Sequence, residues 1–379
     1  MAHPQQVLVV GAGVVGLSIS WLLQRQGHPV RLLDPCLKGH PAADSGSWAA
    51  LGVLMGQVFH RSSGRGWRLR QRSLELWREW IEVLEAQGHS IPYRQGLLLL
   101  ASDGQERERQ GRLSKERQAK GYPLELWDPA KLQDLQPHLP KAALGGLYSP
   151  ADGQLDPAMA MAALHADAEQ HGLVGHAEEA VAVQRHNGQW RVQCRGGERF
   201  ESRWVVLCAG VHSAKLIEPL GHALPMEPVL GQALELKLAG HPDWQWPDWQ
   251  WPGAVVWRGI NLVPRPDLPG GNRLWLGATL EPGTNACPDA LAGLRGWGNA
   301  DLDWLHGATA VRQWQGHRPR PSQRPAPLLE QLEPGLIMAS GHYRNGVLLA
   351  PASAEWVAQV ISEQDENSSR ESLVNEALT

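Results

Sequence analysis

The amino-acid sequence predicts an α/β protein with two domains, on the basis of three observations. The chain has 379 residues, more than one hydrophobic core usually supports. Residues 1–34 have the pattern of a strand, a glycine turn, a helix and a second strand. From about Met226 the pattern changes to short strands separated by Pro and Gly turns, which indicates a second domain with an antiparallel sheet.

The N-terminal segment carries a dinucleotide-binding motif. Val7–Val10 is a continuous apolar run, typical of a strand that is buried on both faces. The G-x-G-x-x-G that follows permits a tight turn, a close approach of the backbone to a pyrophosphate, and close packing of the next helix on the strand. Unpaired N–H groups and the helix dipole favour negative charge at that helix N-terminus. The predicted phosphate site comprises Gly11, Gly13, Val14, Val15 and Gly16.

The second strand, Val30–Leu33, ends at Asp34. An acid about twenty residues after the glycines is placed to accept hydrogen bonds from an adenosine ribose, and it disfavours a 2′-phosphate. Residues 7–23 are apolar, but they are too short for a membrane helix, contain several Gly and Ser, and follow no basic residue. We therefore expect a cytoplasmic protein without a membrane span.

Composition and motif searches exclude several other classes. The formal net charge of -4 argues against non-specific nucleic-acid binding. The four cysteines show no C-x-x-C spacing, and the sixteen histidines show no H-x-x-x-H on a helix. We therefore expect neither a disulfide framework nor a metal site. No G-x-S-x-G nucleophile element is present.

Small residues dominate the loop at 38–56, which follows the second strand. Such a loop can pass close to a bound ligand, although an ordinary surface loop is the alternative. The helix expected at 105–120 alternates Arg or Lys with Glu and is expected to present a solvated face. The segment 152–156 precedes Pro157 at a helix start. We expect helices at 69–84, 105–120 and 157–171, and strands at 97–101, 180–184, 190–194 and 204–208.

The strand at 204–208 is also followed by two small residues, Ala209 and Gly210. A cofactor would pass at this point, the carboxyl edge of a parallel sheet. In the second domain a tandem Asp-Trp-Gln-Trp-Pro repeat at 243–252 contains too much proline for a helix. This loop either forms a lid over a pocket or packs on the sheet edge. We expect strands at 231–238, 254–257, 261–265, 273–279, 310–315 and 336–340, and helices at 288–306 and from about 346 to 362.

The sequence resembles the family of FAD-dependent D-amino acid and glycine oxidases, and it looks most like the glycine oxidase branch. The resemblance covers nearly the whole chain and includes the order of the motifs. Besides the N-terminal motif and its acid, it rests on VVLCAGVHS at 205–213, LVPR and RLWLGATLEPG within 262–283, GHRP at 316–319 and GHYRNGVLLAP at 341–351.

This resemblance implies a Rossmann-like FAD-binding domain and a mixed-sheet α+β substrate domain. The FAD-binding domain would comprise residues 1–88, 152–225 and 317–379, and the substrate domain residues 89–151 and 226–316. Related sarcosine oxidases attach flavin to a cysteine near the GHRP position, but no cysteine follows Cys287. Non-covalent FAD is therefore expected. Its further contacts would be Ser47, Gly52, Ala209, Gly210, Gly341, Arg344, Asn345, Gly346 and Val347.

The resemblance also implies how a substrate is held. Arg318 matches the arginine that binds the substrate carboxylate, and Arg344 lies close to the substrate. A guanidinium pairs with a carboxylate bidentately and so positions Cα. Hydride transfer to the flavin would then give an imine, its 2-oxo acid, ammonia and, with molecular oxygen, hydrogen peroxide. Dehydroglycine for the thiazole of thiamin is one such product. Assembly into a homo-oligomer stays open.

Two positions depart from the glycine oxidase pattern. Asn261 replaces a tyrosine that helps to hold the substrate, and Gly259 replaces a histidine. The substrate therefore stays open among glycine, sarcosine and D-amino acids. Three alternatives also stay open: a D-amino acid dehydrogenase with an acceptor other than oxygen, a flavin enzyme of tRNA wobble-uridine modification, and a flavin-binding protein without catalysis.

Overall fold

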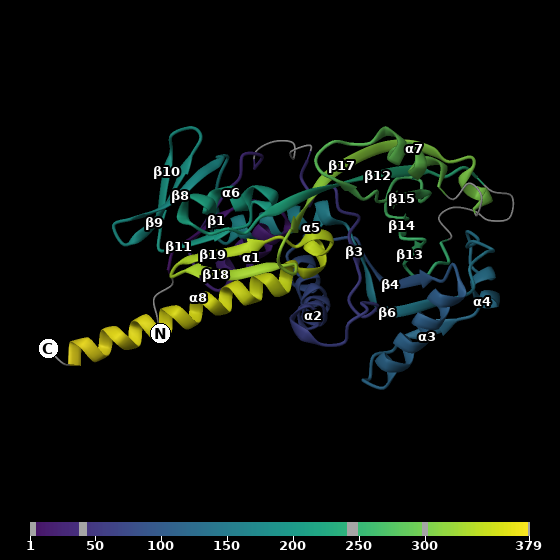
Figure 1. Cartoon of the computed structure of the whole chain (residues 1–379), viewed down its shortest axis with the longest axis horizontal. Helices are drawn as coiled ribbons and strands as arrows, with labels where there is room; N and C mark the ends of the chain where they lie inside the picture. The colour runs from purple at the N-terminus through teal and green to yellow at the C-terminus, as the bar shows by residue number, and fades with distance from the viewer. Residues whose placement is uncertain (1–4, 38–43, 241–248, 298–301, 378–379) are drawn as a thin grey trace.

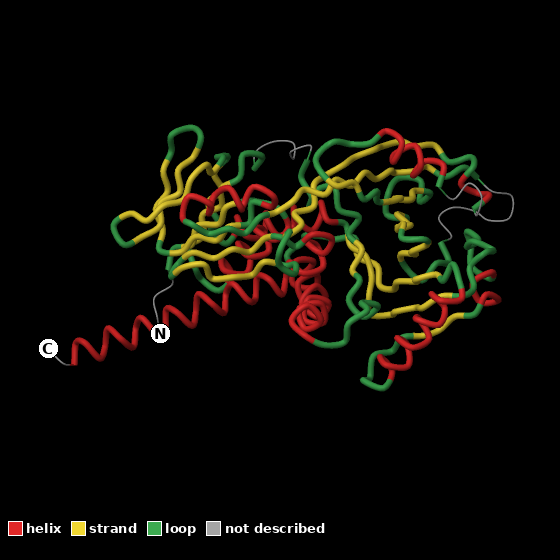
Figure 2. Tube along the Cα trace, in the orientation of Figure 1, coloured by secondary structure: helices red, strands yellow, loops and turns green. Residues whose placement is uncertain are grey.

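The computed structural model describes residues 5–37, 44–240, 249–297 and 302–377. Two large sheets lie next to each other along the long axis of the molecule (Figure 1). The long strands β12 (Met226–Lys237) and β17 (Thr309–Pro321) pair with each other in the second sheet and extend toward the first. Figure 2 shows that most helices belong to the half that contains the N-terminus. The expected α/β fold with a second, mixed sheet is confirmed.

The first sheet has six strands in the order β18-β19-β11-β1-β2-β7. β1 pairs in parallel with both β2 and β11, as the Rossmann-like prediction requires, and only β18 is antiparallel. Its strands are β1 (Val7–Val10), β2 (Val30–Leu33), β7 (Val174–His176), β11 (Trp204–Leu207), β18 (Leu328–Glu333) and β19 (Leu336–Ser340). A separate antiparallel sheet contains β8 (Ala180–His186), β9 (Gln189–Cys194) and β10 (Arg199–Ser202).

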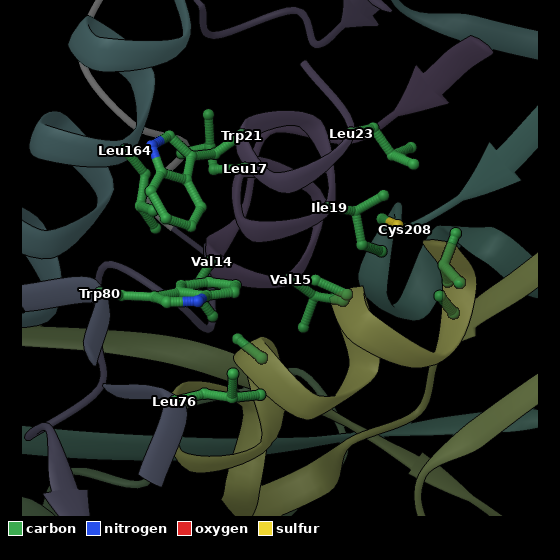
Figure 3. Packing of buried hydrophobic residues seen from close by; sticks show 14 of the residues in the cluster. Val14, Val15, Leu17, Ile19, Trp21, Leu23, Leu76, Trp80, Leu164 and Cys208 are labelled. Atoms are coloured by element: carbon green, nitrogen blue, oxygen red, sulfur yellow. The ribbon is translucent and has the colours of Figure 1, made fainter. Parts of the chain in front are cut away.

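Helix α1 (Val14–Arg25) is at the centre of the core beside this sheet. It packs against α5 (Pro157–Gln170) and α8 (Gly346–Ala377), and α8 also packs against α2 (Gly64–Ala86). Figure 3 shows the apolar side chains of α1 among residues of these neighbours. The rings of Trp21 and Trp80 lie 4.5 Å apart between centroids. Burying such side chains contributes about 1.5–3 kcal/mol each, which fixes the N-terminus of α1 relative to the sheet.

The second sheet is mixed. Antiparallel pairs join β12 to β15, β15 to β14 and β14 to β13, whereas β13 and β4 are parallel. Its further strands are β3 (Val53–Leu54), β4 (Tyr93–Leu100), β5 (Glu125–Trp127), β6 (Gly146–Leu155), β13 (Ala254–Trp257), β14 (Ile260–Arg265), β15 (Arg273–Gly277) and β16 (Glu281–Pro282). The remaining α-helices of the described residues are α3 (Gly104–Gln118), α4 (Pro129–Gln133), α6 (Ser213–Ile217) and α7 (Pro288–Gly296).

The domain boundaries stay a prediction, but sheet membership can be compared with them. Every strand of the six-stranded sheet lies within 1–88, 152–225 or 317–379. β3 lies within the first of these segments and yet pairs with β6 of the other sheet. The chain thus crosses between the two sheets more often than the predicted boundaries indicate.

Several expected element boundaries are wrong. The helix expected at 288–306 ends at Gly296, because Trp297 is extended. β17 does not stop at residue 315 but includes the GHRP segment, because it pairs with β12 as far as Pro321. α8 continues to Ala377, since no Gly or Pro follows Pro351. The segment expected to precede the helix at 157–171 lies mostly in β6, and Asp156 caps α5.

The tryptophan repeat is only partly described, because residues 241–248 lie outside the described ranges. Trp249 and Trp251 are buried in the core of the second sheet, where their indole nitrogens donate to the carbonyl oxygens of Gly271 and Pro137. Neither ring lines the large cavity described below. This part of the repeat therefore packs on the sheet and does not act as a lid.

Across the ranges that the structure describes, every helix is too short or too polar to cross a lipid bilayer.

Candidate cofactor and substrate site

A cavity of about 1760 Å³ extends from the first glycine turn to β17 and to the N-terminus of α8. Among the site residues predicted from sequence, all but Gly16 and Gly341 line it. The N-terminal residues of α1 and α8 both contribute to the wall, so the positive ends of two helix dipoles face one space. The cavity therefore suits a long, anionic ligand at one end and a small anion at the other.

The glycines of the first turn have different structural roles. Gly11 has φ +104°, and a Cβ there would lie 2.6 Å from the carbonyl oxygen of Cys208. A Cβ on Gly16 would lie 1.8 Å from the carbonyl oxygen of Gly11, which explains why Gly16 supports the turn without lining the cavity. Gly341 has φ +66°, and a Cβ there would lie 2.8 Å from Pro321. Gly16 and Gly341 are thus packing positions.

Asp34 and Ser47 fix the backbone at the end of the cavity that contains the glycine turn. Asp34 accepts hydrogen bonds from the main-chain nitrogens of Ala12 and Cys36, both at 2.8 Å. The Ser47 hydroxyl accepts one from Val14 N at 3.0 Å, at the start of α1. A carboxylate has about four acceptor positions. Asp34 can therefore accept from a ribose while it also fixes the turn.

Five residues, 341–345, connect β19 to α8 at the other end of the cavity. His342 is buried, and its Nε2 lies 2.8 Å from the Ser353 hydroxyl, which itself donates to the carbonyl oxygen of Leu349. Because that hydroxyl has one proton to give, Nε2 must be the donor. Burial, together with the Arg65 charge, lowers the pKa of His342 to about 3, so the ring is neutral. Tyr343 adopts a left-handed φ of 54°.

Arg318 reaches the cavity from β17. Its Nη1 donates to the carbonyl oxygens of Leu230 and Thr279, each at 3.2 Å. Gly231 makes room for it, because a Cβ there would lie 2.2 Å from the guanidinium. Burial and the nearby positive Arg344 lower the pKa of Arg318. No carboxylate of the described residues forms an ion pair with it, so its remaining donors are available to an anion.

Glu281 lies near Arg318 but is engaged elsewhere. It accepts from the Thr279 hydroxyl, the Gln232 side chain at 3.0 Å and Cys287 N at 2.6 Å. Despite burial, which acts in the opposite direction, these hydrogen bonds hold the pKa of Glu281 below its usual range. Glu281 therefore supports the Thr279 segment and leaves Arg318 accessible to a ligand.

Arg117 supports a loop of the cavity wall, a role that was not predicted from the sequence. The helix expected at 105–120 is not fully solvated, because Arg117 is completely buried. Its guanidinium donates to the carbonyl oxygens of Gln57, Phe59 and Arg61 and lies over the Trp67 ring, 4.2 Å from its centroid. Residues 58–60 of that loop line the cavity. The charge alternation could not show this, because the partners lie about sixty positions away.

Asp152 supports the preceding part of the same loop. Its carboxylate accepts from the main-chain nitrogens of Gly56, Gln57 and Val58 at 2.8, 2.8 and 3.1 Å. Burial raises the pKa of Asp152, although these hydrogen bonds act in the opposite direction. Arg117 thus binds the carbonyls of the loop and Asp152 its N–H groups. Such complementary contacts hold a cavity wall in one conformation.

The comparison with known proteins agrees with this arrangement. A model of the FAD dependent oxidoreductase family matches residues 6–360. The chain belongs to this family. It is 28% identical to a glycine oxidase of Geobacillus kaustophilus, covering 96% of this chain and 95% of that protein. It is 30% identical to a glycine oxidase of Pseudomonas putida, covering 94% of each. A crystal structure of the Geobacillus kaustophilus glycine oxidase matches with a TM-score of 0.83 and 28% identity over 95% of both chains.

The residues of this FAD-dependent oxidoreductase fit its cofactor. The glycine turn and the N-terminus of α1 would hold the pyrophosphate, and Asp34 would hold the adenosine ribose. Asn345, Gly346 and Val347 line the far wall, where the N-terminus of α8 favours negative charge. FAD supplies a two-electron acceptor when it is bound.

Proposed function

We propose that this oxidoreductase oxidises the C–N bond of a small amino acid. The hydrogen of Cα leaves the substrate with two electrons and the neutral amine gives up one proton, so the C–N single bond becomes a C=N bond, which water hydrolyses to a 2-oxo acid and ammonia, or methylamine in the case of sarcosine. Two electrons and two protons reduce oxygen to hydrogen peroxide when oxygen is the final acceptor. Glycine, sarcosine and small D-amino acids are the proposed substrates, and dehydroglycine for the thiamin thiazole is a proposed use of the product.

The accessible guanidinium of Arg318 is the observation that carries this proposal. Its Nη1 is anchored by two carbonyl oxygens, whereas Nη2 and Nε have no hydrogen-bond partner among the described residues. A partly buried cation without a counter-charge is unfavourable, and a carboxylate that binds bidentately would compensate it. Such binding fixes Cα at one place in the cavity. Positioning of this kind can supply a large part of the catalytic effect.

The neutral side chain of His342 and the two helix N-termini also contribute to the electrostatic potential in the cavity. A neutral His342 adds no charge beside the N-terminus of α8, so the helix dipole and the nearby Arg344 are what favour electron density there. Cys208 lines the cavity, but its thiol is buried and its pKa is raised by that burial. A thiol held in this form is a poor nucleophile, which supports non-covalent FAD.

The proposed function is tested by anaerobic mixing of the FAD-loaded protein with glycine, sarcosine, D-alanine and D-proline in turn. We expect at least one of them to bleach the visible absorbance of the flavin. Bleaching by none of these compounds would contradict the proposal. A second measurement compares oxygen uptake with peroxide formation: equal amounts support an oxidase, whereas turnover only with an added quinone supports a dehydrogenase.

A further inference from the structure

Arg70 on α2 is a second arginine of the cavity wall with accessible donors. The residue lines the cavity and is only 7% exposed. Its Nη1 donates to the carbonyl oxygen of Met55 at 2.9 Å, and its guanidinium lies over the Phe59 ring, 3.9 Å from the ring centroid. Nε and Nη2 have no hydrogen-bond partner among the described residues, and neither belongs to the unpaired side-chain atoms that are sealed from solvent. Two donors of a buried cation are therefore available to a ligand.

The charge of Arg70 is not neutralised by an ion pair. No carboxylate of the described residues forms one with it. The charge of Asp152 acts on Arg70, but the carboxylate oxygens of Asp152 accept from the main-chain nitrogens of residues 56–58. Burial lowers the pKa of Arg70 to about 10 against this attraction, so the guanidinium still carries its charge at neutral pH. A buried cation with unsatisfied donors is unfavourable, and an anionic ligand would compensate it.

Arg70 and Arg318 are anchored in the same way from different elements. In each side chain, Nη1 donates to main-chain carbonyls while Nε and Nη2 are unpaired among the described residues. Met55 carries the carbonyl that holds Arg70, and Ala278 precedes Thr279, whose carbonyl holds Arg318. Both anchoring segments adjoin one apolar cluster that lines the cavity with Met55, Val58, Leu99 and Ala278. The cavity thus offers two carboxylate sites that share an apolar wall.

We propose that the preferred substrate is an amino acid with a second carboxylate, which Arg70 binds while Arg318 binds the carboxylate next to Cα. This inference rests on the proposed function and specifies its substrate class as dianionic amino acids. A guanidinium binds a carboxylate through two parallel hydrogen bonds, and Nε and Nη2 of Arg70 are the two donors that this requires. The Phe59 ring covers one face of the guanidinium and restricts its orientation.

The second carboxylate can be attached at either of two places. It is on the side chain in D-aspartate and on the amine substituent in N-(2-carboxyethyl)glycine. D-Alanine and sarcosine are the matching substrates that lack it. Comparison of kcat/KM within each pair shows which attachment reaches Arg70, and we expect a preference of about 30-fold for the dianionic member of at least one pair, as for charged hydrogen bonds with a buried group.

Binding is measured separately from turnover. Succinate, glutarate and butyrate have no amine, and the two diacids differ in the distance between their carboxylates. Perturbation of the visible flavin spectrum of the FAD-loaded protein gives their dissociation constants. We expect the better diacid to bind about 30-fold more tightly than butyrate.

Arg78 provides a matched control on the same helix. Its Nη2 also donates to one main-chain carbonyl, that of Ala151 at 2.9 Å, but the residue does not line the cavity. Arg70→Met should lower the preference for the diacid over butyrate by about 30-fold. Arg70→Lys keeps the charge without the paired donors and should lie between Arg70→Met and the unmodified protein. Arg78→Met should leave the preference unchanged.

Two results would overturn the inference while the proposed function stands. One is equal binding of the diacids and butyrate to the unmodified protein, which needs no variant. The other is an unchanged preference in Arg70→Met, or in Arg70→Lys if the methionine variant does not retain FAD. The proposed function fails on a different observation, which is that no amine, with one carboxylate or two, bleaches the flavin.

Discussion

The carboxylate of Asp34 accepts a hydrogen bond from the main-chain nitrogen of Ala12 at 2.8 Å, so the end of β2 holds the glycine turn that follows β1. The same carboxylate accepts from Cys36 N. One side chain therefore determines the shape of the turn and also faces the cavity where an adenosine ribose would bind. Loss of this carboxylate should weaken cofactor binding through both effects.

We expect Asp34→Ala to raise the dissociation constant for FAD by about 10- to 100-fold, because hydrogen bonds to a charged acceptor are lost. Asp34→Asn keeps one acceptor and should be intermediate. Asp103→Ala is the control, since Asp103 caps α3 and does not line the cavity. Quenching of flavin fluorescence on binding gives the constants. Equal dissociation constants for Asp34→Ala and Asp103→Ala would disprove the role of Asp34.

A methyl group at Gly16 should be poorly tolerated. Its Cβ would lie 1.8 Å from the carbonyl oxygen of Gly11, so α1 would have to move away from β1. We expect Gly16→Ala to lower the free energy of unfolding by about 1–3 kcal/mol, as overpacking does, and to reduce FAD retention. Gly66→Ala in α2 meets no atom within 4 Å and should be neutral or slightly stabilising. Denaturant unfolding with and without FAD distinguishes the two.

Arg117 should contribute much more to stability than the other arginines of α3. Arg117→Ala leaves the carbonyls of Gln57, Phe59 and Arg61 without their donor. We expect a loss of about 3 kcal/mol in the free energy of unfolding. Arg112→Ala removes only an exposed pair with Glu108 and should change it by less than about 0.5 kcal/mol. Similar values for both variants in urea unfolding would show that the loop does not depend on Arg117.

The neutral ring of His342 should make the protein less stable in mild acid. The pKa of His342 is about 3 in the folded chain against 6.5 without burial. Between pH 7 and pH 5 the unfolded chain binds a proton that the folded chain does not, so the free energy of unfolding falls as the pH is lowered. The expected contribution is about 2 kcal/mol. His342→Gln should remove this part of the pH dependence, whereas an unchanged profile would contradict a buried neutral ring.

The parts of the fold that depend on local pattern could be predicted from the sequence. The glycine turn and Asp34 belong to one strand–helix–strand unit, so their spacing alone predicted that they lie at the same edge of the sheet; the hydrogen bond from Ala12 N to Asp34 was not predicted. The roles of Arg117 and Asp152 could not be predicted, because both depend on a loop that lies some sixty to ninety-five positions away. The family resemblance indicated that Asn261 was unusual, but only the pairing of β14 with β15 shows that its amide is oriented by Gly277.

The most direct test of the account measures how the rate of anaerobic flavin bleaching depends on glycine or sarcosine concentration in Arg318→Ala. Arg312→Ala is the control, because Arg312 lies on the same strand and pairs with Glu235 at an exposed position. We expect Arg318→Ala to retain FAD and to need about 100-fold more substrate for half-saturation, as for a lost charged hydrogen-bond pair. Arg312→Ala should behave like the unmodified protein. Identical concentration dependence in both variants would contradict carboxylate binding by Arg318.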